Sequence, residues 1–125
     1  GRYQVAFNHT VLEHVFDIRK AIANICALSN DTVILVTPFL QQVHYIEDSF
    51  GDWWRPTPMC LERLLKEQGF HVVYQSSNDN PWHVVYVVTL ACRDPENYRG
   101  RLPFSKTAKD AGTVHFGFGE ADTVN

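Results

Sequence analysis

The side chains best suited to chemistry lie in the aromatic segment between residues 40 and 58. His44 stands out there, because a neutral imidazole near pH 7 suits a general base that deprotonates a hydroxyl or an amine. The alternative role of His44 is a hydrogen bond that stabilises the loop. We take His44 as the candidate catalytic residue.

The same segment contains the run Asp52-Trp53-Trp54-Arg55. Asp52 and Arg55 have the spacing of an ion pair that could hold the loop, but an exposed pair contributes only ~0–1 kcal/mol, so a structural role requires burial. Consecutive side chains of an extended stretch point to opposite faces, which leaves one Trp free to cover a substrate or contact a partner. We expect Trp53, Trp54, Arg55 and Phe39 to bind substrate.

A second group of polar residues, Asn8, His9 and Thr10, follows the short apolar run Tyr3 to Phe7. This run predicts a strand, and ligands gather beyond the carboxyl ends of strands in open α/β sheets. Thr10 and Glu13 also have the spacing of a capping box, which predicts that a helix starts at Thr10 and that Glu13 caps it.

The strand around which these groups are arranged is Thr32 to Phe39 (TVILVTPF), with a turn expected just before it at Ser29-Asn30-Asp31. Its apolar residues do not alternate with polar ones, so we expect both faces to be covered by helices, as in the middle of a mainly parallel sheet. Pro38 cannot donate to the sheet and marks the carboxyl end.

The remaining elements give the order β-α-β-loop-α-β-β, with a terminal antiparallel hairpin and hence an α/β fold. A first helix from Thr10 to about Leu28 carries an apolar stripe, and a second is capped by Thr57, starts at Pro58 and stops at Gly69. Two apolar runs joined by a turn form the hairpin. The expected segments are strands at 70–75 and 82–92, a turn at 76–81, a domain over 1–95, and a partly ordered tail over 96–125 with a short strand at 113–118.

Composition narrows the classes of function. The chain has 125 residues, which is enough for one domain. Its net charge of −3 does not show the excess of basic residues that is typical of general nucleic-acid-binding proteins. Cys26, Cys60 and Cys92 are far apart and are expected to be buried and unpaired, and no spacing indicates a metal site. With no apolar run long enough for a membrane span and no signal-peptide pattern, we expect a cytoplasmic protein.

Several short segments resemble the C-terminal half of S-adenosylmethionine-dependent methyltransferases. These proteins have a Rossmann-like, three-layer fold, in which helices cover both faces of a sheet that has one antiparallel strand. The segments are Val11 to Val15 (VLEHV), Thr37 to Phe39 (TPF), His44 with Gly51 to Thr57 (GDWWRPT), and Glu67 to Phe70 (EQGF). The resemblance covers about Tyr3 to Ala91. It implies that the methyl donor lies near Asn8, His9 and Thr10, and that the acceptor is a small molecule or saccharide.

The Gly-rich turn that binds the donor in this family is absent from the sequence. A glycine turn allows close approach to the cofactor, but the string Gly117-Phe118-Gly119 has no strand before it and no helix after it. S-adenosylmethionine is therefore expected only if another half completes the fold. The chain is a fragment, a subunit completed by another polypeptide, or a non-catalytic dimerisation or interaction module. We expect a homo-oligomer or a partner chain to pair along the open edge Tyr3 to Phe7.

Overall fold

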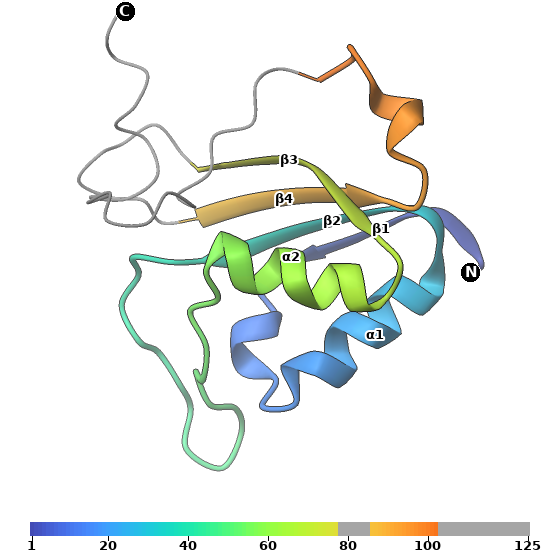
Figure 1. The fold of residues 1–125 in the computed structure, drawn as a ribbon. Coiled ribbons are helices and arrows are strands. Elements are labelled where there is room, and N and C mark those ends of the chain that lie inside the picture. The colour runs from blue at the N-terminus through green and yellow to red at the C-terminus, as the bar shows by residue number, and fades with distance from the viewer. Residues whose placement is uncertain (78–85, 103–125) are drawn as a thin grey trace, which may run out of the picture.

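The computed structural model describes residues 1–77 and 86–102. Most of the expected hairpin turn, the start of the strand expected from Trp82, and the short strand expected at 113–118 lie outside these residues. The expected order of elements is confirmed, with two short 3-10 helices added (Figure 1). The elements are β1 Tyr3–His9, η1 Leu12–His14, α1 Ile18–Leu28, β2 Ser29–Pro38, α2 Pro58–Glu67, β3 His71–Ser77, β4 Tyr86–Cys92 and η2 Pro95–Tyr98.

The strands form one four-stranded sheet in the order β1-β2-β4-β3. β1 and β2 are parallel. β4 lies between β2 and β3 and is antiparallel to both. The register pairs Phe7 with Ile34 across β1 and β2, and Ile34 with Leu90 across β2 and β4. The parallel crossover and the antiparallel hairpin predicted from the sequence are both present.

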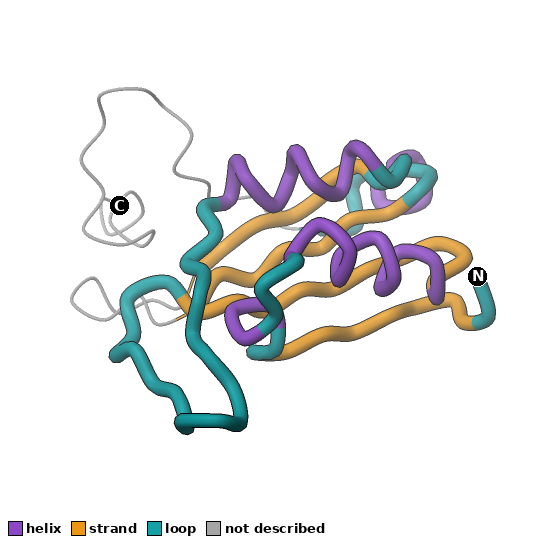
Figure 2. The backbone as a smooth tube through the Cα atoms, turned by 90° about the horizontal axis from the view of Figure 1, so that it is seen from below, coloured by secondary structure: helices purple, strands orange, loops and turns teal. Residues whose placement is uncertain are grey.

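Both α-helices lie on the same face of the sheet (Figures 1 and 2), so the described residues form two layers. The expectation of a three-layer arrangement with helices on both faces was wrong for this part of the chain. Each crossover moves in the same direction across the sheet, and right-handed crossovers in one direction place their helices on one face. Ile34, on the other face, is only half-buried, whereas Val33 and Leu35 are fully buried; Thr32, on the same face as Ile34, is buried where its hydroxyl contacts the Tyr98 hydroxyl of η2.

The first helix begins later than the capping box predicted. Thr10 adopts a left-handed backbone with φ of 50°, and α1 starts at Ile18 with Asp17 as its N-cap, whose carboxylate accepts from the Lys20 amide at 3.1 Å. Glu13 is buried instead of capping. Asp17 takes the cap because a short Asp side chain satisfies a first-turn amide as well as Thr does. Val11, at the start of the expected stripe, is exposed.

The second helix agrees with its prediction at both ends. The Thr57 hydroxyl accepts from the Cys60 amide at 3.2 Å, Pro58 is the first helical residue, and the helix stops before Gly69, whose φ of 76° favours glycine. Leu61, Leu64 and Leu65 are buried in the core beneath the helix.

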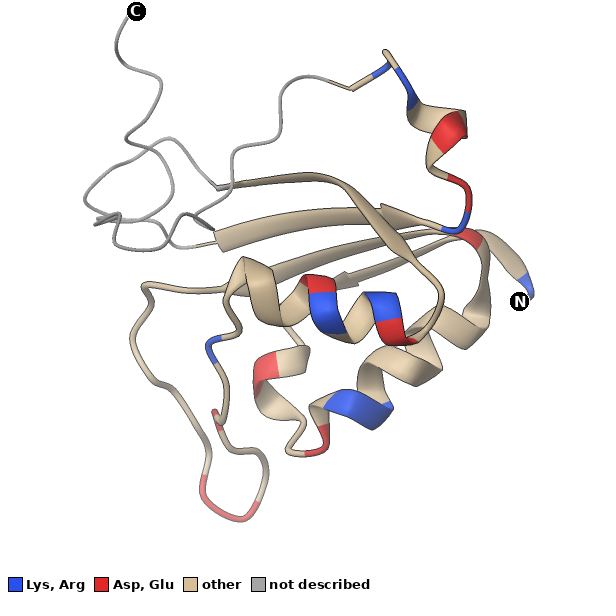
Figure 3. Ribbon diagram, viewed as in Figure 1, with Lys and Arg blue, Asp and Glu red and all other residues tan. Residues whose placement is uncertain are grey.

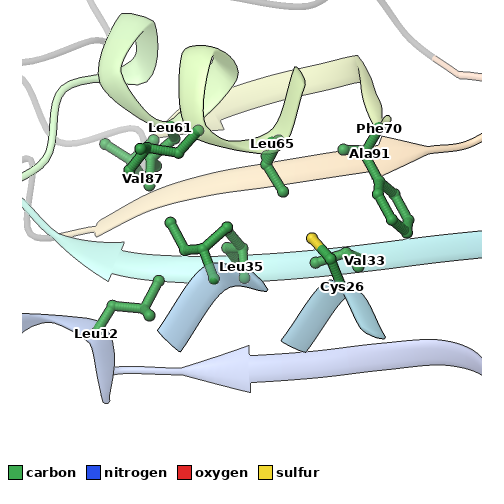
Figure 4. Packing of buried hydrophobic residues seen from close by; sticks show 11 residues of the cluster. Leu12, Cys26, Val33, Leu35, Leu61, Leu65, Phe70, Val87 and Ala91 are labelled. Carbon is green, nitrogen blue, oxygen red and sulfur yellow. The ribbon is translucent and has the colours of Figure 1, made fainter. Parts of the chain in front are cut away.

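The core lies between the sheet and the two helices (Figure 4). Ser29 begins β2 and is not part of a turn as expected, because its hydroxyl donates to the Thr32 carbonyl at 2.7 Å and so supports the strand start. Cys26 and Cys92 are buried, and burial raises the pKa of the Cys26 thiol to about 11. Cys60 is exposed, contrary to expectation, because it lies on the solvent side of α2.

Charged residues lie mostly on the helices and loops and are nearly absent from the described strands (Figure 3). β1, at one edge of the sheet, contains no charged residue and no proline. Its Tyr3, Val5 and Phe7 side chains are 60%, 49% and 65% exposed, and they alternate with residues that face the core side. In the described part of the chain, no helix is long and apolar enough to cross a membrane.

Candidate functional site

The candidate site is built on the loop that leaves the carboxyl end of β2 and returns to α2, residues 39–57. Two hydrogen bonds attach this loop to η1. The Trp53 amide donates to the Glu13 carbonyl at 2.7 Å, and the His14 ring contacts the Gly51 carbonyl through Nδ1 at 2.6 Å. The loop therefore lies against the segment that follows β1, beyond the carboxyl ends of both parallel strands.

The Asp52–Arg55 pair expected from the sequence is present. Two guanidinium nitrogens contact the two carboxylate oxygens at 2.5 and 2.8 Å, and the Asp52 side chain is fully buried while that of Arg55 is 23% exposed. The hydrogen bond from Arg55 lowers the pKa of Asp52 from its usual value of 3.8 to about 2. Its burial gives this pair the structural role that an exposed pair lacks.

The same ion pair fixes the backbone on both sides of the loop. The His44 amide donates to Asp52 Oδ2 at 3.0 Å, and Arg55 also donates to the Gln41 and Gln42 carbonyls at 3.5 and 3.4 Å. The Asp52 carboxylate and the Arg55 guanidinium thus connect the first part of the loop, near residues 41–44, to the part that leads back to α2. The backbone of His44 is held within this network.

His44 belongs to a cluster of three rings. Its imidazole is 52% exposed and meets the His14 ring edge-on, with centroids 4.8 Å apart, and the Phe50 ring lies 4.8 Å from His14 and 5.9 Å from His44. His44 Nδ1 is 3.7 Å from Asp52 Oδ2. The imidazole is therefore half-exposed, and the buried carboxylate beside it lies beyond hydrogen-bond distance of the ring.

Glu13 is the least expected member of the site. Its side chain is 1% exposed, Oε1 lies 3.6 Å from Nε2 of His14, and Oε2 has no hydrogen-bond partner among the described residues. From the sequence we expected Glu13 to cap a helix and His14 to be a packing or surface residue. Asp17, a residue type that favours N-caps, is the signal in the sequence that could have placed the start of α1 after this segment.

Trp53 and Trp54 form an exposed aromatic patch with Phe16. The Phe16 ring lies 5.3 Å from Trp53 and 5.9 Å from Trp54, and these side chains are 68%, 53% and 37% exposed. The Trp54 indole donates to the Val15 and Phe16 carbonyls at 3.1 Å each. Gly51 is required beneath Trp53, because a Cβ there would lie 2.3 Å from the indole ring.

The residues expected to bind a cofactor lie at the end of β1. Asn8 has a buried side-chain oxygen without a hydrogen-bond partner among the described residues, His9 packs on Tyr86 with centroids 5.6 Å apart, and Thr10 Oγ1 lies 3.0 Å from His9 Nδ1. Phe39, expected to bind substrate, packs partly buried against the core. Among residues 1–77 and 86–102, no group of three or more potential ligands could hold a metal ion.

The structure thus brings His44, Trp53, Trp54 and Arg55 together in one loop docked on η1. Asn8, His9 and Thr10 lie just before η1, at the end of β1. An open depression of about 400 Å³ is lined by residues 45–51 and Trp53. The arrangement offers one exposed imidazole, an aromatic patch and a buried ion pair that keeps the loop in place.

No protein-family model and no curated protein matches this chain. The solved structures that share its fold include two of magnesium protoporphyrin IX methyltransferase (ChlM) from Synechocystis PCC 6803. The structure with bound SAM is 14% identical, with a TM-score of 0.55, and the match covers 75% of this chain and 40% of that chain. The structure with bound SAH is 13% identical, with a TM-score of 0.58, and the match covers 75% and 46%.

At these identities the comparison establishes the fold alone. The matched part of the chain has the fold of part of an S-adenosylmethionine-dependent methyltransferase, which agrees with the resemblance seen in the sequence. The chain spans less than half the length of the chain in either of these structures.

Proposed function

We propose that this chain is the acceptor-side half of an S-adenosylmethionine-dependent methyltransferase domain, which needs a second half to bind the donor. The observation that carries this proposal is the sheet order β1-β2-β4-β3, with β4 antiparallel between parallel neighbours and with β1 as an uncharged open edge. An open edge next to parallel strands is where further strands of a Rossmann-like sheet would pair.

The residues at the end of β1 fit one part of the donor. The buried oxygen of Asn8, which has no hydrogen-bond partner among the described residues, could accept a hydrogen bond from an amino group, and Thr10 offers a hydroxyl that lies beside the His9 ring. The sequence contains no Gly-rich βα turn to approach the rest of the cofactor. When bound, the cofactor supplies an electrophilic methyl group. The chain's own contribution is to orient the acceptor and to remove its proton.

On the acceptor side, we assign His44 as the general base. Its exposed ring can take a proton from a hydroxyl or an amine of the acceptor, and Asp52 holds its backbone in place. The exposed rings of Trp53 and Trp54 offer apolar surface on which a small-molecule or saccharide ring could pack, and Arg55 holds the loop through its ion pair with Asp52. Positioning the two reactants in line would supply much of the rate enhancement.

Donor binding provides the first test. We expect calorimetric titration of the 125-residue chain with S-adenosylmethionine to give no heat, and the same titration of the chain joined to its missing half to give saturable binding. The coding sequence upstream of Gly1 is the first place to look for that half. Saturable binding by the chain alone would overturn the half-domain proposal, and no binding by the completed domain would overturn the methyltransferase proposal.

A second prediction concerns the base. In the completed domain, His44→Ala should lower kcat by about 100-fold or more, the usual contribution of a general base, and leave the affinity for S-adenosylmethionine nearly unchanged. His71→Ala, on the exposed side of β3, is the matched control and should keep full turnover. Unchanged turnover in His44→Ala would remove His44 as the base.

A non-catalytic role is the second candidate, and the exposed face of β1 favours it. Tyr3, Val5 and Phe7 form an apolar row on an edge strand without charge or proline, and such an edge associates readily. A two-fold axis would pair two copies of β1 antiparallel and make one continuous eight-stranded sheet, twice the four strands described here.

Light scattering of the chain at high concentration tests this second role. We expect a dimer, converted to monomer by Val5→Lys, because a charge on the edge opposes pairing. Met59→Lys alters an equally exposed apolar side chain on α2 and should leave the dimer intact. A wild-type monomer at high concentration would contradict pairing between copies.

A further inference from the structure

His14 lies between the base and the rest of the fold, and neither the sequence nor the comparisons assigned it a role. It belongs to η1, whereas three of the residues that it contacts, His44, Phe50 and Gly51, belong to the loop. Only 18% of its side chain is exposed, so it is poorly placed to meet a substrate itself.

Its hydrogen bond fixes the position of one ring proton. A carbonyl oxygen can only accept, so Nδ1 of His14 must carry the proton donated to Gly51 O at 2.6 Å. This bond orients the ring and leaves Nε2 directed at the Glu13 carboxylate, 3.6 Å away. The ring is thus held to the loop backbone through Nδ1, while Nε2 faces the buried Glu13 carboxylate beyond hydrogen-bond distance.

The ring of His14 also supports the side chain of His44. Both His44 and Phe50 meet it at nearly right angles, with interplanar angles of 80° and 77°, an arrangement that aromatic rings prefer. Asp52 hydrogen-bonds only the backbone nitrogen of His44 and lies 3.7 Å from its Nδ1, so the edge-on contacts with His14 and Phe50 are the packing that the half-exposed His44 ring receives from other rings.

We propose that His14 is a positioning residue that docks the loop and aims His44. This assignment rests on the proposed role of His44 as the base. The Nδ1–H bond holds the loop at Gly51, and the edge-on contact holds the imidazole of His44. His14 does not touch the acceptor.

Two matched variants separate these contributions. His14→Asn keeps a side-chain N–H near the position of Nδ1 but removes the ring, whereas His14→Phe keeps a ring but removes the donor. We expect hydrogen exchange of the Trp53 amide, which donates to Glu13, to rise by about 5-fold in each single-feature variant and by more than about 10-fold in His14→Ala. Exchange in β2 should not change.

The test does not depend on methyl transfer, because exchange is measured on the chain without donor or acceptor. The ¹⁵N spectrum of wild-type His14 should show a protonated Nδ1, a readout that a merely space-filling residue would not require. An Nε2-only proton, or equal Trp53 exchange in wild type, His14→Phe and His14→Asn, would overturn the proposal. In the completed domain, His14→Ala should lower kcat and leave the affinity for the donor unchanged. If wild type and all variants of the completed domain are inactive, that result contradicts the proposed methyltransferase function but not the docking of the loop by His14.

Discussion

Replacing Arg55 by Met should lower the free energy of unfolding by about 2–3 kcal/mol. The substitution leaves the buried Asp52 carboxylate without its two guanidinium contacts, and an unpaired buried charge is strongly destabilising. The loop can move to hydrate the carboxylate, which places the cost below that of a pair deep in a core. Denaturation by urea, followed by far-UV circular dichroism, measures this difference.

The matched control is Arg19→Met. Arg19 also contacts a carboxylate, that of Glu67 at 2.7 Å, but its side chain is 69% exposed and the pair is well solvated. A cost below about 0.5 kcal/mol is expected there. Equal costs at the two positions would show that burial of Asp52 does not matter to the fold.

The same pair predicts how stability depends on acid. The pKa of Asp52 is lower in the folded chain, about 2, than its usual value of 3.8, so the folded state favours the ionised carboxylate. The stabilisation is fully present above about pH 4 and is lost as the pH falls through about 2. The difference between the two values corresponds to about 2 kcal/mol. The stability gap between wild type and Arg55→Met should therefore shrink over this window.

The second large effect is expected in β2, where neighbouring residues face opposite sides of the sheet. Leu35→Ala should cost about 3–4 kcal/mol, because Leu35 is fully buried between the sheet and the helices and its truncation leaves a cavity. Ile34→Ala removes a similar side chain from the face without an α-helix, where it is only half-buried, and should cost about 1–2 kcal/mol. Urea denaturation of both variants gives the comparison.

The pair of variants also reports on the missing half. If further strands and helices complete the domain and cover the open face, the cost of Ile34→Ala should rise in the completed protein while that of Leu35→Ala stays the same. A cost of Ile34→Ala that is equal in both contexts would mean that this face remains uncovered.

The order of elements could be predicted because each is marked by local chemistry. The apolar run of β2, the Thr57-Pro58 start of α2 and Gly69 at its end are signals that few alternative structures would satisfy. The start of α1 could not be located, because Thr10 and Asp17 both have the chemistry of a cap, and burial of Glu13, a tertiary effect, decides between them. The helices on one face follow from crossover handedness once the strand order is known.

The site was predictable only in part. The spacing of Asp52 and Arg55 indicated their ion pair, and His44 was identified by its place in a long aromatic loop. The contact between His14 and His44 could not be foreseen, because it depends on how the loop returns onto η1. A pattern along the chain does not encode that return.

The position of β4 has a consequence for how this chain folds during synthesis. Of the four described strands β4 is the last to be made, yet it lies between β2 and β3, and β3 has no other strand partner in the described sheet. Until Cys92 has left the ribosome, β3 and α2 lack the strand that joins them to the first half of the sheet. Such non-local pairing is slow and leaves strand edges open in the meantime. A nascent chain ending before Tyr86 should therefore remain sensitive to protease.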